Sequence, residues 1–72
     1  MKKVTQKEWK AYRTIRLTSL GLPSANDNYN IEVYGITAAR WSEINRAVVS
    51  CCGIMDWRDT SLKEVNNVIC FL

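Results

Sequence analysis

The segment VTQKEW at residues 4–9 carries the signals of a helix start, and ITAARW at residues 36–41 repeats its pattern 32 positions later. In each, an apolar residue precedes a threonine that can cap the helix, and a tryptophan follows four positions after the threonine. Downstream, Gly21 and Gly53 are each followed by an aliphatic residue, a typical helix stop. Shared capping rules explain this echo better than an internal duplication. The two segments predict helices over residues 6–20 and 38–52.

A third helix is expected over residues 61–71. Ser61 and Glu64 have the spacing of a capping box. The apolar residues that follow are spaced three and four apart, as on one face of a helix. The final residues 68–72 are rich in β-branched and aromatic side chains, so a strand is the alternative for this tail.

Residues 29–34 predict a short β segment. Tyr29, Ile31 and Val33 alternate with more polar residues, the period of a half-buried strand. Because a lone strand leaves its backbone groups unpaired, Ile31 and Val33 are expected to lie in a strand that pairs with another segment. The candidate partners are the N-terminal residues 1–4, the tail 68–72, a second subunit or a target protein.

The chain has 72 residues, which is enough for one domain and no more. The predicted fold is mainly α, a single compact helical domain over residues 1–72. A chain of this length buries a small core, so association with a second copy or another partner would add useful burial. A homodimer is therefore a reasonable expectation.

The composition argues against an enzyme. The chain has no histidine, which removes the commonest general base near neutral pH. Cys51, Cys52 and Cys70 lack zinc-ligand spacing and are interpreted as small buried side chains. Asp56 and Asp59 are better placed to cap the following helix than to act as paired acids. No catalytic residue, metal site, cofactor or small-molecule substrate is predicted.

Neither a membrane-spanning apolar run nor a secretory leader is present in the sequence. Three cysteines, two of them adjacent, do not form a disulfide framework. A cytoplasmic location is the expectation, with no membrane partner.

The two matched helices differ in what surrounds each tryptophan. In helix 38–52, Trp41 shares its face with apolar residues such as Ile44 and Val48, as a core helix would. In helix 6–20, Trp9 instead shares its face with arginines, and a separate stripe is formed by lysines. The predicted partner-binding residues are Trp9, Tyr12, Arg13, Arg16, Lys3, Lys7 and Lys10. The competing interpretation places Trp9 in the core, with the arginines passing it to reach solvent.

Charge is distributed unevenly. Residues 1–26 hold six basic residues against one acidic residue, although the whole chain carries only +3. A basic first helix favours an anionic partner.

The leading hypothesis is a small non-enzymatic regulator or inhibitor that binds another protein with an acidic surface. Such chains are typical of phages and mobile elements, for instance antirepressors or inhibitors of host defence. The alternative is a small basic DNA- or RNA-binding regulator that uses the first helix. A helix-turn-helix aligned on Gly53 would place Asp59 at a core position, which disfavours that motif.

Overall fold

The computed structural model describes residues 1–53 and 57–72, apart from the side chain of Cys52. Within these residues the chain is helical and contains no strand. In order, the elements are α1 (Gln6–Thr18), α2 (Asp27–Val33), α3 (Ala38–Cys52), the 3-10 helix η1 (Trp57–Asp59) and α4 (Leu62–Ile69). The mainly α fold is confirmed. Asp56, one of the two aspartates expected to cap the following helix, lies outside the described residues.

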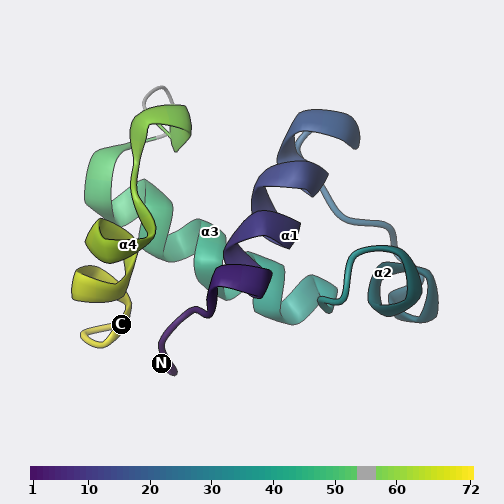
Figure 1. Cartoon of the computed structure of the whole chain (residues 1–72), viewed down its shortest axis with the longest axis horizontal. Coiled ribbons are helices and arrows are strands. Elements are labelled where there is room, and N and C mark those ends of the chain that lie inside the picture. The colour runs from purple at the N-terminus through teal and green to yellow at the C-terminus, as the bar shows by residue number, and fades with distance from the viewer. Residues whose placement is uncertain (54–56) are drawn as a thin grey trace.

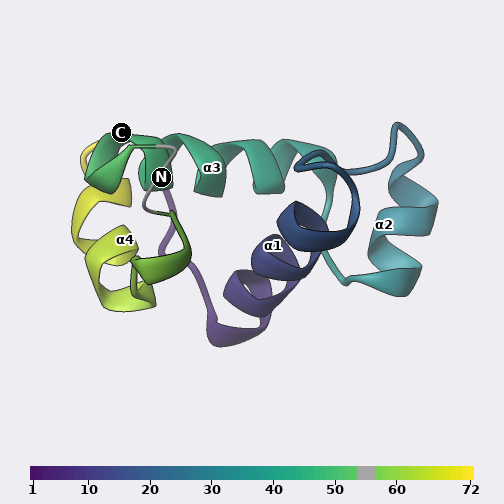
Figure 2. The same cartoon turned by 90° about the horizontal axis from the view of Figure 1, so that it is seen from above.

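Helix α3 is the long central element (Figure 1). Seen from above, α4 packs beside its C-terminal part and α1 crosses its N-terminal half on the same side, whereas α2 lies beyond the far end (Figure 2). The chain ends meet near α4, where the N-terminal ammonium donates to the Ile69 carbonyl at 3.3 Å. The core lies between α1, α3 and α4. Its fully buried apolar side chains include Tyr12, Ile15, Ile44, Val48, Val65 and Ile69.

The predicted helix starts are confirmed. The Thr5 hydroxyl accepts a hydrogen bond from the Glu8 amide at 3.1 Å, and the Glu8 carboxylate accepts one from the Thr5 amide at 3.0 Å. This is a complete capping box. Thr37 caps α3 and Ser61 caps α4 through equivalent side-chain bonds. Local capping chemistry therefore sets where these three helices begin.

The β segment predicted over residues 29–34 is wrong, because this stretch forms α2. The Asn26 side chain caps the helix by accepting from the amides of Asn28 and Tyr29. Asn30 is fully buried, and its amide group bonds both the amide and the carbonyl of Ser24. A polar buried residue breaks the expected alternation. The hydrogen bonds of the α1–α2 loop therefore outweigh the strand preference of Ile31 and Val33.

Two helix ends also differ from expectation. Helix α1 ends at Thr18 because the backbone turns at Leu20 (φ 54°) and Gly21 (φ 87°), and the side chains of Leu17 and Leu22 are both exposed. Helix α4 ends at Ile69, and residues 70–72 form a turn rather than more helix or a strand. Cys70 is exposed there, contrary to its expected burial, and Cys51 is only partly buried.

Candidate functional site

Trp9 and Tyr12 belong to the core, although both were predicted to bind a partner. Their rings stack with centroids 5.5 Å apart and planes 9° from parallel. Tyr12 in turn packs on Trp41 at 5.2 Å, and the Trp41 indole N–H donates to the Tyr12 carbonyl. Trp9 is 5% exposed and Tyr12 is fully buried. Trp9 is therefore a core residue, as the competing interpretation of the sequence held.

The guanidinium groups of α1 lie against these rings. Arg13 lies over Trp9, with its guanidinium carbon 5.9 Å from the ring centroid. Arg16 lies over Tyr12 at 6.0 Å and donates both to the Tyr12 hydroxyl and to the Asn45 side-chain oxygen. Cation–π contacts and neutral acceptors thus hold both arginines in fixed positions, half-buried. The arginines, rather than the aromatic rings, are what α1 presents here.

Two residues that the sequence did not single out join this cluster. Trp57 of η1 is buried, and Arg16 lies over its ring at 4.8 Å. Arg58 lies over the same ring at 5.4 Å, while its carbonyl faces an Arg13 side-chain nitrogen at 3.4 Å. Trp57 and Arg58 are adjacent in the sequence, but nothing in the sequence around them tells which helix they contact. We call Arg13, Arg16 and Arg58 the arginine cluster.

The ion pairs of the described residues all involve Arg40. Its guanidinium binds the Glu8 carboxylate at 2.9 Å and the Glu43 carboxylate at 2.9 Å. It also donates to the carbonyls of Lys2 and Lys3, which ties the N-terminal segment to α3. The hydrogen bond from Arg40, aided by the Thr5 backbone, lowers the pKa of the Glu8 carboxyl. Glu8, the one acidic residue among residues 1–26, is therefore paired with Arg40 rather than with a basic residue of α1.

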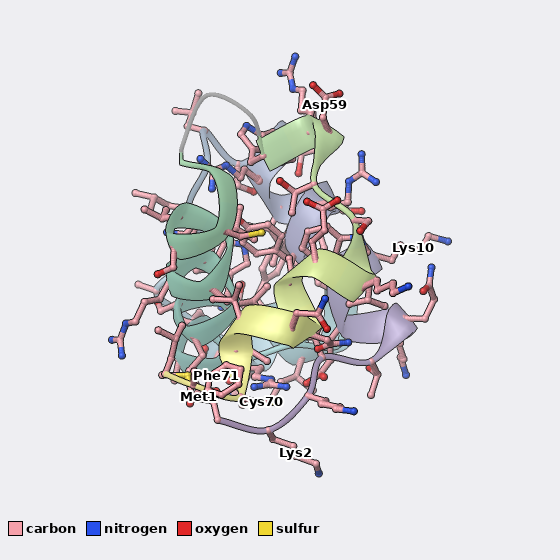
Figure 3. All side chains as sticks on the ribbon, turned by 90° about the vertical axis from the view of Figure 1, so that its left-hand side faces the viewer. Met1, Lys2, Lys10, Asp59, Cys70 and Phe71 are labelled. Atoms are coloured by element: carbon pink, nitrogen blue, oxygen red, sulfur yellow. The ribbon has the colours of Figure 1, made fainter. Side chains whose placement is uncertain are left out.

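The five basic side chains of the predicted site form no ion pair with any described carboxylate. Lys3, Lys7 and Lys10 are exposed, and Arg13 and Arg16 are half-buried. Figure 3 shows Lys10 extending outward from the edge of the molecule. The structure therefore places these five residues along α1 and its approach without internal neutralisation. Such a surface attracts anionic groups, and salt screens that attraction.

Two shallow grooves flank the exposed ridge of α1 at Lys10 and Thr14. One, of about 270 Å³, is lined by Gln6, Trp9, Lys10, Arg13, Thr14 and Leu17. The other, of about 300 Å³, lies between α1 and the end of α2. Its lining residues are Lys7, Lys10, Ala11, Thr14, Val33 and Tyr34. We call the second the α1–α2 groove.

Ile31 and Val33 do not act as strand-pairing residues in this fold. Both lie on α2 and expose about half of their side chains, at 54% and 52%. The amide of Gly35, just after the helix, donates to the Ile31 carbonyl, as a helix end requires. The backbone groups of this segment are therefore used within the helix and cannot pair with another strand. What the segment exposes instead is aliphatic side chains. Tyr34 packs against the hydrophobic core just after α2, and side-chain hydrogen bonding with Ser19 and Thr18 lowers its pKa.

Over residues 1–53 and 57–72, no group of three cysteine or acidic side chains is arranged to hold a metal ion. In that same part of the chain, no helix is long and apolar enough to cross a membrane. No family model, curated protein or solved structure matches this chain.

Proposed function

We propose that this chain is a small non-enzymatic regulator or inhibitor that binds an acidic surface of another protein through α1, of the kind that phages and mobile elements carry. One observation carries the proposal. Five basic residues lie along α1 and its approach, and none is paired with a described carboxylate, whereas Arg40 is paired twice. Arg40 is neutralised within the chain, so its charge is not offered to a partner. The five basic residues of α1 and its approach keep a net positive charge that an acidic surface can neutralise.

The fixed arginines favour specific recognition over diffuse attraction. Arg13 and Arg16 are held on aromatic rings, so little side-chain entropy is lost when their remaining donors meet a carboxylate. Guanidinium groups bind carboxylates through two parallel hydrogen bonds. The lysines of the same helix add long-range attraction that raises the association rate.

The test is affinity capture with a charge-matched control. The tagged chain and two double variants are incubated with nuclease-treated lysate of the source cell, and captured proteins are identified by mass spectrometry. Lys7→Glu with Lys10→Glu reverses charge on α1, whereas Arg46→Glu with Lys63→Glu makes the same change on exposed positions of α3 and α4. A protein retained by the native chain and the control but lost by the α1 variant supports the proposal. Equal retention by both variants would contradict it.

A second candidate function is DNA or RNA binding by the same basic residues, favoured by the absence of described carboxylate partners for Lys3, Lys7 and Lys10. Phosphate contacts would make that binding fall steeply with salt. Fluorescence anisotropy with labelled duplex and single-stranded oligonucleotides over a salt series tests it directly. A shift at low salt that the Lys7→Glu, Lys10→Glu variant abolishes supports this candidate, and no shift at any salt excludes it.

A further inference from the structure

The α1–α2 groove combines two chemistries in one place. Its walls carry the amino groups of Lys7 and Lys10, both exposed and without a described carboxylate partner. Its apolar lining comes from Ala11 on α1, Val33 on α2 and the ring of Tyr34 just after α2, and Val33 is 52% exposed. An apolar strip bordered by lysines complements a ligand that is apolar on one side and negatively charged beside it.

Packing at the end of α2 and the Lys7 side chain shape the groove. Tyr34, the residue that ends α2, packs against the hydrophobic core, and Tyr29 packs edge-on against the Tyr34 ring at 6.1 Å. Lys7 extends across the end of α2, because a Cβ placed at Gly35 would lie 3.4 Å from the Lys7 Cε atom. The Lys7 side chain thus reaches from α1 to the residue just after α2 and lines the groove on the way. At about 300 Å³ the groove is at the small end of the range for ligand pockets, and suits a few peptide side chains.

We propose that the α1–α2 groove is the docking site for an acidic amphipathic peptide segment of the partner protein. An aliphatic or aromatic side chain of that segment packs on Val33 and Ala11, and neighbouring carboxylates pair with Lys7 and Lys10. This inference rests on the proposed function and names the chemistry of the partner. It corresponds to the familiar mode in which an amphipathic helix lays its apolar face in a groove.

A lining that contains one aromatic ring, that of Tyr34, favours a peptide over nucleic acid. Single-stranded nucleic acid bound without sequence preference stacks its bases on aromatic rings, and duplexes are bound through phosphates. The groove offers the single ring of Tyr34 beside half-exposed Val33 and buried Ala11, which is not a series of rings for successive bases. Apolar burial on Val33, by contrast, contributes to peptide affinity in proportion to the area removed from water.

The test begins with selection of binders to the full chain from a random peptide library displayed on phage. Enriched peptides are expected to carry aspartate or glutamate flanking an aliphatic or aromatic residue. A synthetic, labelled copy of an enriched peptide is then titrated by fluorescence anisotropy against native chain and variants.

Two matched pairs of variants isolate the groove. Val33→Ser and Ile31→Ser change equally exposed aliphatic residues of α2, but only Val33 lines the groove. Loss of the buried contact should weaken binding about tenfold for Val33→Ser and leave Ile31→Ser within about twofold of native. Lys10→Glu should weaken binding by about tenfold or more, while Lys63→Glu on α4 should have little effect.

The outcomes separate this inference from the proposed function. Peptides that lose affinity with Arg13→Ala but not with Val33→Ser would overturn the groove and leave the protein-binding function standing. Enrichment of peptides without the acidic and apolar pattern would also overturn it. If labelled oligonucleotides bind and no peptide does, both proposals fail. A dimer in light scattering that Val33→Ser dissociates would make a second copy the occupant, and would overturn the acidic peptide.

Discussion

Arg40 shows how much of this fold depends on a single side chain. It lies at the start of α3, pairs with Glu8 at the start of α1, and donates to the carbonyls of Lys2 and Lys3. Its side chain is 15% exposed and that of Glu8 is 26% exposed, so water screens the pair only in part. Glu8 therefore serves two purposes at once, as capping residue and as counter-ion.

Glu8→Gln is expected to lower the unfolding free energy at neutral pH by about 1 kcal/mol. Glutamine can still close the capping box, so the change reports the charge. The pKa of Glu8 is lowered in the folded chain from its ordinary value of 4.5. Its carboxylate therefore stabilises the fold at pH values above 4.5, and this contribution disappears as the pH falls through the folded-state pKa.

Urea unfolding followed by circular dichroism at neutral pH and in acid measures this difference. The gap between native chain and Glu8→Gln should close in acid. Exposed Glu32, which has no described ion pair, provides the control, and Glu32→Gln should cost little at either pH. A gap that persists unchanged in acid would show that the charge of Glu8 is not what stabilises the fold.

At the scale of elements, α2 is held by polar rather than apolar contacts. Asn30 is its buried residue, and the Asp27 carboxylate accepts from both the Asn30 side chain and the Ala38 amide. The aliphatic side chains of the helix face outward. This inverts the usual amphipathic pattern, in which apolar residues bury a helix. A helix anchored in this way keeps Ile31 and Val33 available for contact with a partner.

Asn30→Ala is expected to destabilise the chain by about 1–3 kcal/mol, because it leaves the Ser24 amide and carbonyl without their partner. Asn28 lies on the same helix and is exposed. Asn28→Ala should therefore be neutral or slightly stabilising, since alanine favours helix. Thermal unfolding of both variants measures the difference. Equal stability of the two variants would mean that the buried amide does not anchor α2.

For the whole molecule, the two ends of the chain are joined by one asparagine. The Val4 amide donates to the Asn66 side-chain oxygen at 2.7 Å, and the Asn66 side-chain nitrogen donates back to the Val4 carbonyl at 3.1 Å. With the Arg40 contacts, this pairing fixes the segment that leads into α1. The position of the basic helix relative to α3 and α4 therefore depends on contacts 62 residues apart in sequence.

Asn66→Ala should cost about 1–3 kcal/mol of unfolding free energy, because both backbone groups of buried Val4 lose their partner. Asn67 is adjacent and exposed, so Asn67→Ala should stay within about 0.5 kcal/mol of native. Differential scanning calorimetry of the pair distinguishes the two residues. Similar melting of both variants would show that the ends are not coupled in this way.

Capping signals are local, which is why the starts of α1, α3 and α4 could be predicted from the sequence. Thr5, Thr37 and Ser61 each bond an amide within three residues, so no distant contact is needed. The basic residues of α1 were also found from the sequence, because charge and helical spacing are visible there. That these basic residues form no described ion pair could not be predicted from the sequence, because pairing depends on which helix each residue faces.

Distant contacts set the rest. Residues 29–34 alternate like a strand, yet the buried Asn30 bonds Ser24 across the loop and the segment becomes helix. Trp9 was equally consistent with core and surface until the packing of Tyr12 on Trp41 placed it inside. Folding alone places Trp57 and Arg58 beside the arginines of α1, because η1 contacts α1 over a separation of more than forty residues. Local hydrogen bonds choose helix starts, whereas burial and charge pairing require neighbours that only the folded chain brings together.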